Sequence, residues 1–392
     1  MWSGLVLTLM ALFLIHYTHL LGRRLRDEKR SLRLEREAPE ALPSPCPSLS
    51  IVVPARNEEK HLRQCLTSIC SLDYDRLEIL VVNDRSTDST GEIARAFSGK
   101  DNRVRVIEGQ DPPPGWTGKN FAIHQGATRA SGTFLLIVDA DTTLAPETCK
   151  RAVAYMDKEN VDLLSLFPRA LCSSMWERAV VPLMGVVSVF RIDRVNDPHY
   201  KDAMAFGCFL LFRRSSFDAI RGYEAIKDRV GEDWIISQKI KGCGMRLRML
   251  MGTEFIQNRF GPSLNEIWQG FTKNLILIMQ GRRLVALLAL PLTVYQFFFL
   301  VSPWIFLVIA PAVLVFTGWD PVWFLILVLA ASQCLVVMGI RSLLRLFLRI
   351  EVSQPYLQPL GGIVISAIGL SAVTRTLLGM GIEWKGRTYR KF

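Results

Sequence analysis

The chain has 392 residues, of which half are hydrophobic, and it carries a formal net charge of +11. This length leaves room for two or three structural units. The basic residues lie beside apolar runs, at residues 23–26 and in the tail 383–392, a pattern that fits membrane flanks and anionic lipid. No zinc-finger, RNA-recognition or helix-turn-helix pattern is present, so we expect no nucleic-acid partner. The eight cysteines form no CxxC pair, which favours reduced thiols over a disulfide framework or a zinc site.

The N-terminal run, residues 2–22, is apolar and long enough to cross a bilayer, which takes about 20 residues. A signal peptide is the alternative, but the positive charge follows the run and no small-residue cleavage site is clear. We therefore predict a transmembrane anchor at residues 1–22 with its basic flank in the cytosol. Residues 23–45 are expected to form a basic, solvated linker.

Strands and helices alternate from residue 46 to about residue 280, which predicts an α/β domain with a mostly parallel sheet. The segments expected as strands are 48–54, 77–83, 104–107, 133–138, 162–167, 204–212 and 245–251. Helices are expected at residues 58–69, 90–97 and 120–130, and after Gly231.

Residues 281–382 are mostly apolar and predict a C-terminal membrane region. Leu284–Thr317 is too long for a simple straight span, and its three prolines could break it. Two arrangements remain open for this run: an interfacial segment followed by a span, or two short packed spans. Pro321–Ile340 and Tyr356–Val373 are further candidate spans. An earlier apolar segment, residues 179–190, is too short to span; it could be a core helix, but we favour an interfacial segment that admits a lipid acceptor.

The basic segments on either side of the last candidate span give conflicting orientations. Arg341–Arg349 and the basic tail 383–392 both predict cytosolic positions, yet only one candidate span separates them. Either the last segment is re-entrant or the charge rule fails at one end. The number of spans therefore stays open.

The strand at Gly132–Val138 ends in two carboxylates, Asp139 and Asp141. Side chains at i and i+2 of an extended chain leave the same face, so this pair can converge on one ligand. Open α/β sheets bind ligands at the carboxyl ends of their strands. The pair could bind a divalent cation through hard oxygen ligands, with a diphosphate supplying others. An acidic turn without a ligand is the alternative.

Polar residues also follow the first two expected strands. Pro54-Ala-Arg56-Asn57-Glu58-Glu59 closes the first, and Asn57 is a plausible helix N-cap with the two glutamates in the first turn. Asp84 ends the second strand, where its carboxylate can accept hydrogen bonds from a nucleobase or a sugar hydroxyl.

Three later stretches carry further candidates. The glycines of Gly115–Asn120 and the amine of Lys119 would suit a diphosphate, although an ordinary helix-start loop is the alternative. Asp233 opens a helix and could act as a general base, or could serve only as negative charge at the helix start. Arg259 or Lys273 could approach the diphosphate, or both could be interfacial basic residues.

Taken together, Pro54–Glu59, Asn83–Ser86, Asp139-Ala-Asp141 and Glu232-Asp233 resemble the motifs of family-2 inverting glycosyltransferases with a GT-A, Rossmann-like fold. Gly115–Asn120 and the stretch Trp268–Asn274 resemble the membrane-bound branch with hopanoid-associated and carotenoid glycosyltransferases, and more distantly ceramide glucosyltransferase. The resemblance covers about residues 46–280.

The resemblance implies a role for each motif residue. Pro54, Arg56, Glu58 and Asp84 would line the nucleoside pocket, and Asp139 would contact the nucleotide. Asp141 would hold Mn or Mg on the diphosphate, and Asp233 would activate the acceptor hydroxyl. Gln257-Asn-Arg259-Phe260 departs from the (Q/R)xxRW motif of processive members, being one residue short and lacking the tryptophan, which favours transfer of a single sugar.

The sequence thus predicts an integral membrane enzyme with a cytosolic catalytic domain, in the plasma membrane if the source is bacterial. It would move one sugar from a nucleotide-sugar, with UDP favoured, to a lipid hydroxyl. A processive polysaccharide synthase and a non-catalytic membrane adaptor with a decayed transferase domain are the alternatives.

Overall fold

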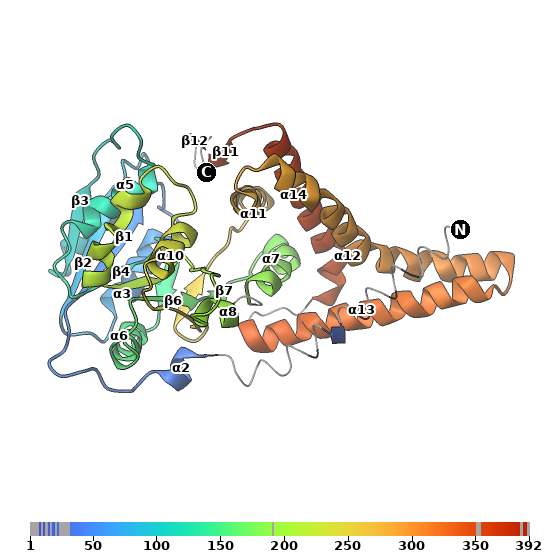
Figure 1. The fold of residues 1–392 in the computed structure, drawn as a ribbon, viewed down its shortest axis with the longest axis horizontal. Helices are drawn as coiled ribbons and strands as arrows, with labels where there is room; N and C mark the ends of the chain where they lie inside the picture. Colours follow the sequence, from blue (N-terminus) through green and yellow to red (C-terminus); the bar gives the residue numbers. More distant parts are fainter. Residues whose placement is uncertain are drawn as a thin grey trace.

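The structure, a computed structural model, describes residues 32–189, 192–349, 354–384 and 387–389, with a few isolated residues before them. An α/β domain lies at one end and a group of long helices at the other (Figure 1). The predicted anchor at residues 1–22 and the first part of the linker fall largely outside the described residues.

The domain is built on a seven-stranded sheet that is mostly parallel, as predicted. In spatial order the strands are β3 (Val104–Glu108), β2 (Leu77–Asn83), β1 (Leu49–Ala55), β4 (Phe134–Ile137), β8 (Leu210–Arg213), β6 (Leu163–Phe167) and β9 (Leu247–Met251). The first four strands in this order run parallel, whereas the fifth, β8, runs antiparallel to both of its neighbours.

Helices cover both faces of this sheet, because the strands are apolar on both sides. In β1, Ile51 and Val53 pack in one core cluster and Val52 in the other. The helices on the face of Ile51 are α3 (Leu62–Cys70), α4 (Thr90–Ser98) and α6 (Thr148–Lys158). The helices on the face of Val52 include α5 (Gly118–Ala127), α9 (Arg214–Ala219), the 3-10 helix η2 (Gly222–Ile226) and α10 (Glu232–Gly242).

A second, three-stranded sheet lies beside the carboxyl end of β4. Its middle strand β10 (Ile256–Asn258) pairs antiparallel with β5 (Thr142–Leu144) and parallel with β7 (Arg169–Ala170). Because β5 begins directly after Asp141, this pairing brings Asn258 to the predicted metal-binding carboxylate.

The described part of the predicted linker packs onto the domain instead of being solvated throughout. Arg33 forms a β-bridge with Met251 at the edge of β9. The short helix α2 (Leu34–Glu37) follows, and the side chain of Leu34 is fully buried in the domain core.

The short helix α8 (Ile192–Asn196) packs against β9 of the domain. The helical end contains α7 (Met175–Val189), α11 (Leu264–Met279), α12 (Arg283–Thr317), α13 (Pro321–Leu348) and α14 (Gln358–Leu377), followed by the strands β11 (Ile382–Trp384) and β12 (Arg387–Tyr389). Within the described residues, α12, α14 and residues 321–342 of α13 are long and apolar enough to cross a membrane. The three prolines, which could have broken the first run, do not do so, because α12 continues through Pro291, Pro303 and Pro311. A helix in an apolar region tolerates proline when the freed carbonyls find other partners.

Candidate active site

The carboxyl ends of β1, β2 and β4 meet at one edge of the sheet and carry Arg56, Asp84, Asp139 and Asp141 there. Strand β8 starts at the same edge, since it runs the opposite way and Leu210 pairs with Ile137. The loop before β8, which contains Gly207, therefore crosses the site. The sequence predicts a strand from residue 204, but the chain becomes extended only at Leu210.

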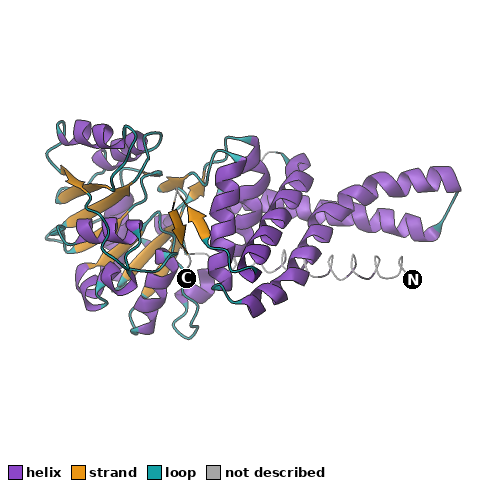
Figure 2. Ribbon diagram, turned by 90° about the horizontal axis from the view of Figure 1, so that it is seen from above, coloured by secondary structure: helices purple, strands orange, loops and turns teal. Residues whose placement is uncertain are grey.

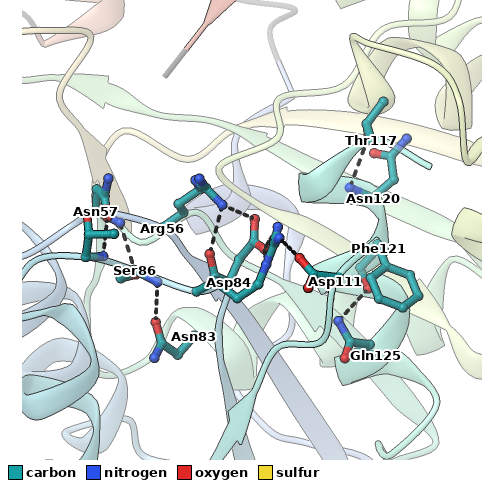
Figure 3. A network of polar contacts seen from close by, with 12 residues as sticks. Arg56, Asn57, Asn83, Asp84, Ser86, Asp111, Thr117, Asn120, Phe121 and Gln125 are labelled. Carbon is teal, nitrogen blue, oxygen red and sulfur yellow. Dashed lines mark hydrogen bonds and ion pairs between the residues drawn. The ribbon is translucent and has the colours of Figure 1, made fainter. Parts of the chain in front are cut away.

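The nucleoside side of the predicted site is a network of charged and polar side chains (Figure 3). Asp84 is buried, and its carboxylate accepts from Arg85 Nη2 at 2.9 Å and lies 3.7 Å from Arg56 Nη1. Arg56 also donates to the carbonyl of Asp84 at 3.2 Å. The two arginines fix the carboxylate at the strand end, next to half-buried Pro54 and Glu58.

Asn57 links the ends of the first two strands and does not cap α3, contrary to expectation. Its backbone N–H donates to Ser86 Oγ at 3.1 Å, and its side-chain oxygen accepts from Thr87 N at 3.0 Å. Its φ of 53° lies in the left-handed region that asparagine tolerates better than most residues. Helix α3 begins only at Leu62, so these bonds organise the loop and not the helix start.

The Gly115–Asn120 loop is tied to the segment that leads into α10. Thr117 caps α5, and its N–H donates to the carbonyl of Lys227 at 2.7 Å. Asn120 Nδ2 donates to the carbonyls of Ile226 at 2.8 Å and Arg229 at 2.9 Å. These bonds place Lys119 beside the first turn of α10.

Lys119 bridges two carboxylates from distant parts of the chain. Its Nζ lies 2.7 Å from Asp139 Oδ1 and 2.6 Å from Glu232 Oε1. Burial favours the neutral amine, but the two carboxylates outweigh it and raise the pKa of Lys119 well above its ordinary value. Burial likewise opposes ionisation of Glu232, yet Lys119 and then Lys273 lower its pKa. Both groups are therefore charged at neutral pH.

Asp233 faces the same site as Asp139. Its Oδ2 accepts from the N–H of Gly207 at 3.2 Å. A Cβ atom at Gly207 would lie 3.3 Å from Asp139 Oδ2 and 3.5 Å from Asp233 Oδ2, so the two carboxylates flank one glycine. Burial, and then the negative charge of Glu232, raise the pKa of Asp233 to about 6. Such a carboxylate is ionised at neutral pH but basic enough to take a proton.

Asp141 is held by a residue whose role the sequence did not indicate. Asn258 Nδ2 donates to Asp141 Oδ1 at 2.9 Å and to Thr142 Oγ1 at 3.0 Å. The amide is buried; one of its hydrogens bonds the Asp141 carboxylate and the other bonds the Thr142 hydroxyl, which fixes the orientation of the amide. Among the described residues, no three His, Cys, Asp or Glu side chains form a metal-binding group.

Comparison with known proteins agrees with this geometry. Residues 50–221 match the family model Glycosyl transferase family 2. The chain contains a glycosyl transferase family 2 domain. The resemblance inferred from the four motifs is confirmed, and this domain coincides with most of the sheet and its strand-end residues.

Curated relatives match the domain at moderate identity. The chain is 27% identical over 233 residues to 4,4'-diaponeurosporenoate glycosyltransferase of Staphylococcus haemolyticus. The aligned region covers 58% of this chain and 61% of the relative. The protein of the same name from Staphylococcus aureus (strain USA300) is also 27% identical over 233 residues, with 58% and 60% covered. The match thus spans less than two thirds of the length of these relatives.

The whole fold is similar to that of mannosyltransferase PcManGT from Pyrobaculum calidifontis, solved in complex with GDP-Man and Mn2+. The TM-score is 0.50 at 16% identity, with 94% of this chain and 99% of that chain covered. The family 2 domain therefore has the predicted GT-A fold.

The two late basic candidates occupy different places around the family 2 domain. The guanidinium of Arg259 lies 2.9 Å from Glu177 Oε1 and donates to Ser173 Oγ at 2.6 Å, at the start of α7. Lys273, on α11, is near enough to Glu232, Lys119 and Asp233 for their charges to affect its pKa, which burial lowers. The structure thus brings Lys273 to the carboxylates and pairs Arg259 with a helix start.

Gly207→Ala is expected to impair the site without unfolding the family 2 domain. The added methyl group would sit 3.3 Å from Asp139 Oδ2, closer than nine in ten real Cβ contacts, and would press on both Asp139 and Asp233. We expect activity to fall by roughly tenfold or more, about 1.4 kcal/mol of transition-state stabilisation. Gly242→Ala, where nothing lies within 4 Å, is the matched control. Equal activity in both variants would contradict this role of the Gly207 loop.

Proposed function

We propose that this chain is a membrane-bound inverting glycosyltransferase that transfers one sugar from a nucleotide-sugar to the hydroxyl of a lipid. The observation that carries the proposal is the meeting of Asp139 and Asp233 on either side of Gly207, with Lys119 bridging Asp139 to Glu232. Three segments far apart in sequence thus bring the proposed base Asp233, the ammonium group of Lys119 and the carboxylate of Asp139 into one site.

The proposed reaction assigns one step to each group. Asp233 takes the proton of the acceptor hydroxyl while the oxygen of that hydroxyl attacks the anomeric carbon of the sugar. The bond from that carbon to the diphosphate oxygen breaks, and the nucleoside diphosphate leaves from the opposite face, so the configuration inverts. Lys119, and Lys273 behind it, supply positive charge beside the departing diphosphate. Pro54, Arg56, Glu58 and Asp84 border the proposed nucleoside pocket.

The residues present fit a divalent cation that is completed by the substrate. Mg²⁺ is commonly held by one or two carboxylates together with substrate phosphates, so a third protein ligand is not needed. Asp141, oriented by Asn258, would hold Mn or Mg through its carboxylate, and Asp139 would lie beside it. When bound, the cation would neutralise charge on the diphosphate. Arg259 is paired with Glu177, so it would contact the nucleotide-sugar only if that ion pair opened.

The names of similar proteins support the class of the acceptor. The curated relatives are named for 4,4'-diaponeurosporenoate, which supports a lipid-like acceptor. We propose UDP as the nucleotide of the donor, from the family resemblance of the Asp84 motif. A glycosyl-transfer screen with UDP- and GDP-sugars on membrane lipid extracts tests both points. Transfer from a UDP-sugar is the expected result, and the absence of transfer from every donor would refute the function.

The same screen tests the first alternative, and binding of UDP and Mn²⁺ tests the second. Products with several added sugars would indicate a processive synthase, which the departure at Gln257–Phe260 disfavours. A non-catalytic adaptor with a decayed domain should bind neither UDP nor Mn²⁺. Its site would also have no need for the three carboxylates Asp139, Asp141 and Asp233.

The activity should depend on the ionisation of Asp233. A general base acts in its deprotonated form, and burial together with Glu232 raises the pKa of Asp233 to about 6. We expect kcat/KM to be level above this pH and to fall about tenfold per pH unit below it. Initial rates between pH 4.5 and 8, with donor below KM, check the profile. A rate that stays level down to pH 4.5 would exclude a base with this pKa.

A further inference from the structure

Two arms at the far end of the molecule form a helical hairpin that projects away from the catalytic domain (Figures 1 and 2). The arms are the second half of α12, from Leu300 to Thr317, and α13 from Pro321 to Arg341. At 1.5 Å per residue they are about 26 and 30 Å long, close to the roughly 30 Å thickness of a bilayer core. Trp319, at the tip, is 72% exposed.

The first half of α12 lies against α14 and runs antiparallel to it. The residues that a Cβ atom would meet at two glycines of α14, and at one glycine just after it, show this direction. Gly362 faces Leu300, Gly369 faces Thr293, and Gly379 faces Arg283. In Figure 1, α14 crosses the base of the hairpin and does not extend along it. The 35-residue helix α12 therefore has one half in the hairpin and one half beside α14.

Both ends of α14 lie on the side of the catalytic domain. At its start, Gln358 accepts from Arg341 Nη1 at 2.6 Å, and Arg341 also donates to the carbonyl of Arg178 in α7. At its end, β11 packs against α11, the helix that carries Lys273 to the carboxylates. A helix whose two ends meet one face of the protein cannot also connect the two sides of a bilayer.

The outer surface of this pair of helices is apolar and exposed. On the first half of α12, Leu284, Leu288 and Leu292 are 69%, 69% and 64% exposed. They recur every fourth residue, so they share one face of the helix. On α14, Ile363 and Leu370 are also exposed, while more than half of its apolar window is buried inside the protein. Arg282 and Arg283 are exposed beside this apolar face, where they can meet lipid phosphates.

We propose that α14 and the first half of α12 rest in the bilayer leaflet on the catalytic side, and that within the described chain only the hairpin of residues 300–341 crosses the membrane. The occupant of the exposed apolar face is the lipid of that leaflet, because the face is continuous with the crossing hairpin. This arrangement places Arg341–Arg349 and the basic tail 383–392 on the same side. The conflict between their charges, evident in the sequence, then disappears. The proposal does not depend on the chemistry of the site.

Single-cysteine labelling of the full chain in sealed membrane vesicles of one orientation tests the arrangement. In a background with the native cysteines replaced, three thiols are compared: exposed native Cys243 on the catalytic domain, Met380→Cys after α14, and Trp319→Cys at the hairpin tip. A membrane-impermeant maleimide should label Cys243 and Met380→Cys from the same side. Trp319→Cys should be labelled only from the other side or after detergent is added.

Other labelling patterns would overturn the proposal. Met380→Cys reacting from the side of Trp319→Cys would make α14 a span, and Met380→Cys unreactive from both sides would bury its end in the membrane. Trp319→Cys reacting together with Cys243 would show that the hairpin does not cross. If Met380→Cys is poorly produced, Leu378→Cys, also exposed at the end of α14, replaces it.

Discussion

Asp233→Asn is expected to lower kcat by about 100- to 10,000-fold, the range that general-base catalysis contributes. The amide keeps the shape of the side chain, and its one oxygen can still accept the 3.2 Å bond from the Gly207 N–H, at the expense of the bond from the Trp234 N–H within its own helix, so the fold and the loop should survive. It cannot take the proton of the acceptor hydroxyl. Single-turnover transfer with saturating donor measures the loss, and equilibrium binding of the nucleotide should be almost unchanged.

The neighbouring carboxylate provides the control for this variant. Glu232 pairs with Lys119 at 2.6 Å, so Glu232→Gln removes a charge from the site without removing the proposed base. We expect Glu232→Gln to weaken donor binding, since Lys119 loses one of its two partners, and to retain more of kcat than Asp233→Asn. If Glu232→Gln lost more of kcat than Asp233→Asn, the base would be Glu232 and not Asp233.

The sequence predicts the strands best where burial alone decides them. The predicted strand 77–83 coincides with β2, and β1 and β3 differ from prediction by one residue at their ends. The prediction is too long at residues 204–212, because Met204–Phe209 are apolar yet lie in the loop that crosses the site. Apolar content cannot separate a core strand from a buried loop, since both exclude water.

The motifs predict the chemistry of the site, but they do not predict the contacts between distant segments. Asp139 and Asp233 were expected to converge, and they do so around Gly207, a glycine that no motif marks. Asn258 adjoins Arg259 in sequence, yet the sheet turns Asn258 to Asp141 and Arg259 to Glu177. Alternation along a strand sends neighbours to opposite faces, so choosing between them requires the register of β10.

The membrane region shows a similar limit. Proline is disfavoured inside a helix, so three prolines in one apolar run predict a break. Helix α12 nevertheless stays continuous, with Leu300 and Val301 still against Gly362 of α14. The segment at residues 179–190 was expected at the interface, but Ala179, Val180 and Val181 are buried within the described part of α7. Hydropathy records how apolar a segment is and not what covers it.

Asp141→Asn is expected to lower metal-dependent activity by at least about 100-fold, which corresponds to roughly 2.7 kcal/mol. The asparagine can keep the 2.9 Å contact with Asn258 through its oxygen, so the small sheet of β5 and β10 should remain intact. It loses the negative charge that a hard divalent cation requires. Rates measured over a range of Mn²⁺ and Mg²⁺ concentrations should show that higher metal concentration restores only part of the activity.

A binding measurement separates loss of the cation from loss of the fold. Titration of Mn²⁺ in the presence of UDP should show weaker binding by Asp141→Asn than by the unchanged protein, whereas thermal unfolding of the two should coincide. Asp218→Asn, which removes an exposed carboxylate paired with Arg214 on α9, is the matched control and should bind Mn²⁺ normally. Unchanged Mn²⁺ binding by Asp141→Asn would remove this carboxylate from the metal site, because the substitution changes its charge and almost nothing of its shape.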